Sequence, residues 1–168
     1  PCTDPTQVRR RDPYFDEFDG RHRHAFGPGK CGWAAGVYLC LFVNNILGLR
    51  VDVPARRVSL RPFCPWPDFT WQSCRLGRAM FDFAYEHRDH HIIGQIINRN
   101  DRAFEGLIEL TLPERTAAWH CTINGVKTEE IQPTQRYHRP AVQASKPIAP
   151  GELLRFEVYY TPEREDSR

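Results

Sequence analysis

The stretch Phe104-Glu105-Gly106-Leu107-Ile108-Glu109-Leu110-Thr111-Leu112 decides the fold of this 168-residue chain. Every even-numbered position in it is apolar or glycine, and the odd-numbered positions are polar except for one leucine. Because successive side chains of a strand point to opposite faces of a sheet, this period of two predicts a β-strand with one buried face.

Short segments with the same alternation, separated by Pro and Gly, make up most of the chain after Val51. Asn124-Gly125 lies between two of them and predicts a two-residue hairpin turn, because both central positions of that turn need positive φ. About eight short strands at this spacing predict a mainly β fold, a β-sandwich over residues 51–162 with a charged tail at 163–168. The strands are expected at residues 57–61, 79–87, 92–99, 104–112, 118–123, 126–129, 141–145 and 153–160.

Upstream of these strands, residues 33–47 (WAAGVYLCLFVNNIL) predict a single helix that Gly48 ends. This helix is apolar nearly all the way round, so it needs cover on most sides, and the rest of the chain is too small to provide all of it. We therefore expect a buried helix that packs on structure supplied elsewhere. Residues 1–32 are rich in Pro, Gly, Arg and Asp and predict a loop.

Composition excludes several classes of function. The chain has 23 Lys and Arg against 21 Asp and Glu, and a net charge of +2 is too small to predict a nucleic-acid or membrane-surface partner. The longest apolar run is broken by Asn44-Asn45 and falls short of the ~20 residues of a membrane span. The six cysteines lack zinc-finger spacing and favour free thiols, with disulfides left open, and no cofactor is expected.

The order of these segments resembles the C-terminal end of the six-hairpin, (α/α)6-barrel glycosidases, especially the trehalase-like, glucosidase and debranching-type families. The matching motifs are GPGKCGWAA at residues 27–35, Ile-Leu-Gly-Leu at 46–49 and VSLRPFCPWP at 58–67. The resemblance implies that residues 1–50 are the last loop and helix of a barrel and that the β-sandwich closes against it. The single methionine, Met80, and the opening Pro1-Cys2 fit a piece of something larger. A helix-rich partner chain or precursor segment would then carry the rest of the barrel, and the substrate would be an oligo- or polysaccharide.

Inverting glycoside hydrolysis needs a carboxylic acid and a second carboxylate that activates water. In the similar enzymes the general base lies shortly before the last barrel helix, which points here to the segment from Tyr14 to Gly20. Matching by residue type selects Glu17, which we prefer, whereas aligning on the aromatic-Asp pair Phe18-Asp19 selects Asp16. Alternatively, these carboxylates form a solvated acidic turn. The general acid is expected outside the chain, so the isolated chain should be inactive.

The same segment offers groups that could bind a sugar. Trp33 can stack on a sugar ring or simply pack at the helix start, and Lys30, His22 and His24 can hydrogen-bond hydroxyl groups. The loop Gly27-Pro28-Gly29 could instead hold phosphate, which would make the enzyme a glycoside phosphorylase.

Two further clusters have competing interpretations. The histidines of residues 87–91 read as a polar hairpin loop, and no metal site is expected. Trp66, Phe69 and Trp71 form either the plug where the sandwich meets the barrel, which we favour, or an exposed sugar platform. The second possibility corresponds to a different function, that of a non-catalytic carbohydrate-binding β-sandwich.

Overall fold

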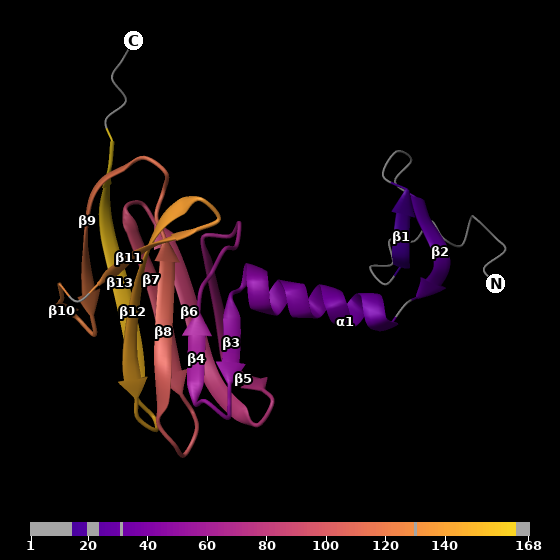
Figure 1. Cartoon of the computed structure of the whole chain (residues 1–168), viewed down its shortest axis with the longest axis horizontal. Helices are drawn as coiled ribbons and strands as arrows, with labels where there is room; N and C mark the ends of the chain where they lie inside the picture. The colour runs from indigo at the N-terminus through magenta and orange to yellow at the C-terminus, as the bar shows by residue number, and fades with distance from the viewer. Residues whose placement is uncertain (1–14, 20–23, 31, 130, 164–168) are drawn as a thin grey trace, which may run out of the picture. The chain divides into compact units, whose positions relative to one another are not determined.

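The computed structural model describes residues 15–19, 24–30, 32–129 and 131–163. The chain divides into two compact units, Pro1–Val43 and Asn44–Arg168 (Figure 1). This division falls a few residues before the boundary expected at residues 50 and 51, which stays a prediction. The expected tail lies, apart from Glu163, outside the described residues.

The described part of the first unit contains a β-hairpin and a helix. Strands β1 (Phe15–Asp19) and β2 (His24–Lys30) pair antiparallel. The prediction of a loop over residues 1–32 is therefore wrong for these two strands. The sequence Gly27-Pro28-Gly29 is typical of a turn, but within the described residues β2 pairs with β1 alone, and an edge strand tolerates proline.

The predicted helix is present in two segments. Helix α1 spans Gly32–Leu41 and continues as a π-helical segment, η2, over Phe42–Ile46. Gly48 follows with φ 71°, as a helix-ending glycine requires, and a Cβ there would lie 1.9 Å from the carbonyl oxygen of Arg61. The α1 side chains that the structure describes are largely exposed, among them Val37, Tyr38, Leu39 and Leu41. No described helix is long and apolar enough to cross a membrane.

The second unit is a two-layer β-sandwich, which confirms the mainly β fold (Figure 1). One sheet has the strand order β10-β9-β13-β7-β6-β5, and the other has the order β11-β12-β8-β4-β3. All pairings are antiparallel except that of β4 with β8, which is parallel. The strands are β3 Leu49–Asp52, β4 Arg57–Leu60, β5 Asp68–Leu76, β6 Ala79–Arg88, β7 His91–Asn98, β8 Phe104–Thr111, β9 Thr116–Ile123, β10 Val126–Lys127, β11 Gln132–Arg136, β12 Arg139–Ile148 and β13 Leu153–Pro162.

The core lies between the sheets and consists of the inward-facing residues of both. Its largest fully buried side chains are Phe81, Phe83, Phe156, Leu49, Leu60, Ile92, Ile96, Ile108, Leu110, Ile148 and Leu154. Gly94 allows the sheets to approach closely, because a Cβ there would lie 2.6 Å from the side chain of Ile108 in the facing sheet. A Cβ at Gly106 would lie 2.3 Å from Ile148 of the neighbouring strand and 3.0 Å from Leu154 of the facing sheet.

All eight predicted strands are present, and the turn at Asn124 and Gly125 has the expected positive φ at both positions (49° and 79°). The sequence pattern missed β3, β5 and β11. In β5 the register shifts at a bulge that contains Ser73 with φ 51°, so the alternation of side chains is interrupted within the strand. Strand β11 contains Pro133, which an edge strand can accommodate.

Candidate functional site

The candidate general-base carboxylates lie on the hairpin that precedes the helix. Glu17 is paired with Phe26 in the β1–β2 ladder, and Asp16 lies at the irregular position between Phe15 and Glu17. His24 is paired with Asp19 at the end of the same ladder. The backbone thus brings both candidate bases and His24 onto one hairpin, and the choice between Glu17 and Asp16 stays open.

The other sugar-binding candidates are distributed around this hairpin. Lys30 is the last residue of β2 and is paired with Phe15, whereas Trp33 lies in the first turn of α1. His22 lies outside the described residues. The Gly27-Pro28-Gly29 segment, the candidate phosphate-binding loop, is part of strand β2.

Exposed aromatic side chains gather at the end of the sandwich where the chain enters from η2. This end is marked by the hydrogen bond from the Phe63 amide to the Ile46 carbonyl (2.9 Å). The rings of Phe63 and Tyr137 meet edge to face, with centroids 4.8 Å apart. The guanidinium groups of Arg136 and Arg139 lie over Tyr137 and Phe63, at 5.2 and 5.7 Å from the ring centroids.

Tyr137 lies in the turn between β11 and β12, with a backbone conformation that its residue type does not predict. Tyr137 and His138 both have positive φ (50° and 65°), although neither is Gly, Asn or Asp. Arg136 is paired with Arg139, so these two residues are the central positions of a two-residue hairpin turn, which needs positive φ at both. Sequence reasoning did not pair Phe63 with Tyr137, because the two residues are far apart in the chain.

The three aromatic residues predicted as one cluster separate into two environments. Phe69 packs against Tyr85, with ring centroids 5.9 Å apart, and is partly buried in the sandwich. Trp66 and Trp71 are 44% and 38% exposed. Their roles as plug or sugar platform stay predictions.

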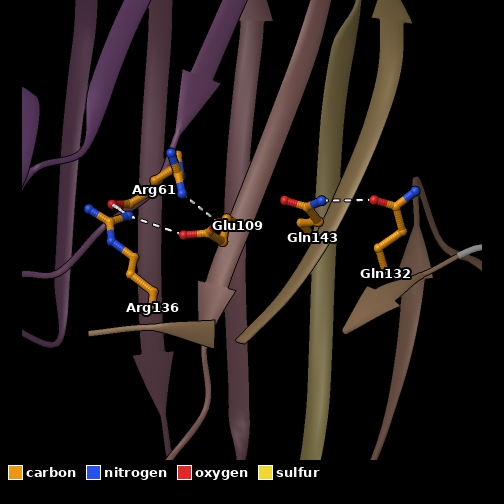
Figure 2. A network of polar contacts seen from close by, with 5 residues as sticks. All are labelled: Arg61, Glu109, Gln132, Arg136 and Gln143. Atoms are coloured by element: carbon orange, nitrogen blue, oxygen red, sulfur yellow. Dashed lines mark hydrogen bonds and ion pairs between the residues drawn. The ribbon is translucent and has the colours of Figure 1, made fainter. Parts of the chain in front are cut away.

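A charged network sits on the outer face of the five-stranded sheet (Figure 2). Glu109 is only 2% exposed and accepts a hydrogen bond from Arg61 at 2.8 Å, while Arg136 Nη1 lies 3.4 Å from its other oxygen. Arg136 also donates to the carbonyl oxygen of Arg61. Arg61, which follows β4, and Arg136 of β11 therefore cover one carboxylate, an arrangement that the outward position of Glu109 in the sequence pattern could not reveal.

The outer face of the six-stranded sheet carries a second polar cluster around Glu157, which is 7% exposed. Its carboxylate accepts hydrogen bonds from Arg155 (2.8 Å) and Thr122 (3.1 Å), and His91 Nε2 lies 3.3 Å away. The hydrogen bond from Arg155 lowers the pKa of Glu157; burial opposes this shift, while Thr122 and the charges of Arg155 and His91 reinforce it.

The histidines of residues 87–91 do not form the predicted loop. His87 belongs to β6 and His91 to β7, which leaves only two residues in the turn. His87 Nε2 and the Tyr160 hydroxyl are 2.9 Å apart, and burial lowers the pKa of His87. The rings of His91 and Tyr159 stack at 4.1 Å. Within the described ranges, no group of three or more His, Cys, Asp or Glu side chains is placed to hold a metal ion.

Four cysteines fall within the described residues, and all four are free thiols. Cys74 and Cys121 are buried, and burial raises the pKa of Cys121 to about 12. These two thiols therefore act as small apolar core residues.

These features define a mainly β protein: a two-layer sandwich preceded by an apolar helix and a hairpin with candidate catalytic carboxylates. No family model matches the chain, and no curated protein matches it. Among solved structures, it is similar to an alpha-L-rhamnosidase from Dictyoglumus thermophilum, with a TM-score of 0.49 and 13% sequence identity. The match covers 75% of this chain and 14% of that glycoside hydrolase, so the chain corresponds to a small part of that protein's length.

Proposed function

We propose that this chain is the C-terminal part of an inverting glycoside hydrolase, to which it contributes a general-base carboxylate and a β-sandwich cap. In the proposed assembly, α1 completes an (α/α)6 barrel whose other helices come from a helix-rich partner chain or precursor segment. The observation that supports this proposal best is the exposure of the apolar helix α1.

The helix has the composition of a core element and the exposure of a surface element. Gly32–Leu41 contains no charged residue, yet Val37, Tyr38, Leu39 and Leu41 are 51–60% exposed. Burying the exposed part of each aliphatic side chain would contribute roughly 1 kcal/mol. A contiguous apolar surface of this kind marks an interface in a soluble protein.

The position of the candidate base fits the same arrangement. Strand β2 ends at Lys30 and α1 begins at Gly32, so the hairpin that bears Glu17 and Asp16 is joined to the helix through a single residue. A partner that covers the helix would therefore lie near the hairpin, where it could supply the general acid across the sugar. This arrangement also predicts that the isolated chain has no activity.

The catalytic assignment is tested in the complete assembly by comparing Glu17→Gln and Asp16→Asn. Loss of the general base should lower turnover by at least about 100-fold in one of the two variants, without loss of assembly. Asp101→Asn, in an exposed loop, is the matched control and should retain wild-type turnover. Near-normal turnover in both Glu17→Gln and Asp16→Asn would refute the assignment.

The partner is tested by copurification of the tagged chain from its native source. We expect a helix-rich polypeptide in a fixed ratio and its loss in the variant Leu39→Asp. Val126→Asp is the matched control, because Val126 is also exposed (69%) but lies on the sandwich. Equal recovery of the partner with both variants would contradict a role for α1 in the interface.

The exposure of Trp66 and Trp71 favours a second candidate, a non-catalytic carbohydrate-binding β-sandwich. A soluble, monomeric chain that binds sugar and loses binding in Trp71→Ala would support this alternative. A glycoside phosphorylase with the same barrel is distinguished by a requirement for inorganic phosphate during turnover.

A further inference from the structure

The outer face of the five-stranded sheet contains a groove of about 540 Å³ that is separate from the residues of the proposed active site. This volume lies within the range of small-ligand sites. The groove crosses four neighbouring strands, β3, β4, β8 and β12. Its lining consists of Arg50, Val51, Asp52, Arg57, Val58, Ser59, Glu105, Leu107 and Ser145.

The strand register arranges the outward-facing groups in two parallel rows. The first row runs from Arg50 through Ser59 and Leu107 to Ser145, each residue paired with the next across the sheet. At a strand spacing of about 4.8 Å, this row is about 14 Å long, which is longer than a single sugar ring. The second row consists of Asp52, Arg57 and Glu105, which are also direct cross-strand neighbours.

The two carboxylates of the groove are held by hydrogen bonds, whereas the guanidinium group of Arg57 between them is available to a ligand. Asp52 accepts a hydrogen bond from the Ala55 amide at 2.9 Å, and Glu105 accepts one from the Ser145 hydroxyl at 2.7 Å. Arg57 stands between the two carboxylates in the register, yet its guanidinium makes no hydrogen bond or ion pair with any residue that the structure describes. Its five N–H donors are free to bind a ligand.

The floor of the groove adds an apolar surface. Leu107 occupies an outward position of β8 between Ser59 and Ser145, where the alternation of the strand calls for a polar residue. On the next outward row, Gln143 donates a hydrogen bond to Gln132 at 2.8 Å, beside Glu109 (Figure 2). Hydrogen-bonding side chains thus continue past the groove along the same face.

The charges decide the class of ligand. The lining of the groove includes two arginines and two carboxylates, so an anion would meet Asp52 and Glu105, and a cation would meet Arg50 and Arg57. A neutral polyhydroxylated chain avoids both conflicts, because its hydroxyl groups accept from guanidinium groups and donate to carboxylates. The C–H face of a sugar ring would also cover Leu107.

We propose that this groove binds a neutral oligosaccharide along the outer face of the five-stranded sheet, with residues that the proposed active site does not use. The choice of a sugar rests in part on the proposed function. The groove itself belongs to the sandwich alone, and its occupancy is measured without turnover, so the two proposals can fail separately.

The test uses the full chain, together with its partner polypeptide where one copurifies. Fluorescently labelled malto-, cello- and xylo-oligosaccharides serve as probes in anisotropy titrations. Hydrogen-exchange mass spectrometry then locates the bound sugar. We expect protection in peptides that cover β3, β4 and β8, and about tenfold weaker binding in Arg57→Ala, since a hydrogen bond to a charged group is lost.

Two variants make the result specific. Arg75→Ala removes an exposed arginine from β5 of the other sheet and should bind as wild type, whereas Glu105→Gln should weaken binding in the same direction as Arg57→Ala. Absence of sugar-dependent protection in β3, β4 and β8 with every probe would overturn the proposal. Wild-type affinity in Arg57→Ala, or loss of binding only in Trp71→Ala, would overturn it as well.

Discussion

Replacing Glu109 by glutamine should destabilise the sandwich strongly, although Glu109 lies on an outward-facing position of its strand. The side chain of Glu109 is 2% exposed, and those of Arg61 and Arg136 are 35% and 9% exposed. The substitution keeps the shape of the side chain but removes the only acidic group that pairs with either arginine in the described structure. Two guanidinium groups are then left beside each other without a counter-charge.

The expected magnitude follows from the burial of the network. Removing one partner of a buried ion pair costs about 3–5 kcal/mol, because the remaining charge stays desolvated. Arg136 is the more deeply buried arginine, so most of the cost arises from its side chain. For a protein of this size, such a loss corresponds to a fall of about 6–20 °C in Tm.

Urea unfolding followed by tryptophan fluorescence measures the effect, with Trp66, Trp71 and Trp119 as probes within the sandwich. Glu105→Gln is the matched control, since Glu105 lies on the same face of β8 but is exposed, and it should change the free energy of unfolding by less than about 1 kcal/mol. A loss in Glu109→Gln no larger than that of the control would refute the view that burial of Glu109 controls the network.

Two other predictions follow from the structure. The lowered pKa of Glu157 means that its ionised form stabilises the fold; this contribution should be complete above the ordinary glutamate pKa of about 4.3 and be lost as the pH falls through the lower folded-state value. In Glu157→Gln the free energy of unfolding, measured with urea at several pH values, should therefore fall less steeply at acid pH than in the wild type. An unchanged pH dependence would contradict this prediction. Gly77→Ala should lower the free energy of unfolding by about 1–2 kcal/mol, because Gly77 has a φ of 65°. Gly48→Ala should lower it by at least about 1 kcal/mol more, because the added Cβ would also overlap the Arg61 carbonyl. Equal losses of stability in the two variants, measured by thermal unfolding, would exclude that overlap.

The parts of the fold that could be predicted from the sequence are those set by local chemistry. The alternation in β8 identified its buried face, and Asn124-Gly125 identified a tight hairpin. Strand β5 could not be predicted in the same way, because the bulge at Ser73 shifts the side chains within the strand. Alternation reports which face a residue occupies but not what covers that face, so the burial of Glu109 was missed.

The candidate site shows the same limit more clearly. Glu17 and Asp16 were selected by their position before the apolar helix, and the hairpin that holds them was not expected. The groove was not visible in the sequence at all, because its lining combines the consecutive strands β3 and β4 with β8 and β12, which are distant along the chain. Its residues are individually ordinary, and only the register of β3, β4, β8 and β12 places them together.

The parallel pairing of β4 with β8 also affects the order in which the strands can pair during synthesis on the ribosome. The strands made between them, β5, β6 and β7, belong to the opposite sheet, and Arg61 is 48 residues from Glu109. At roughly 5–20 residues per second, the ribosome needs roughly 2–10 s to deliver β8 after β4 has emerged. Throughout that delay the apolar segment Gly32–Leu41 is already outside the exit tunnel, so its apolar side chains are exposed to solvent before the sandwich has formed.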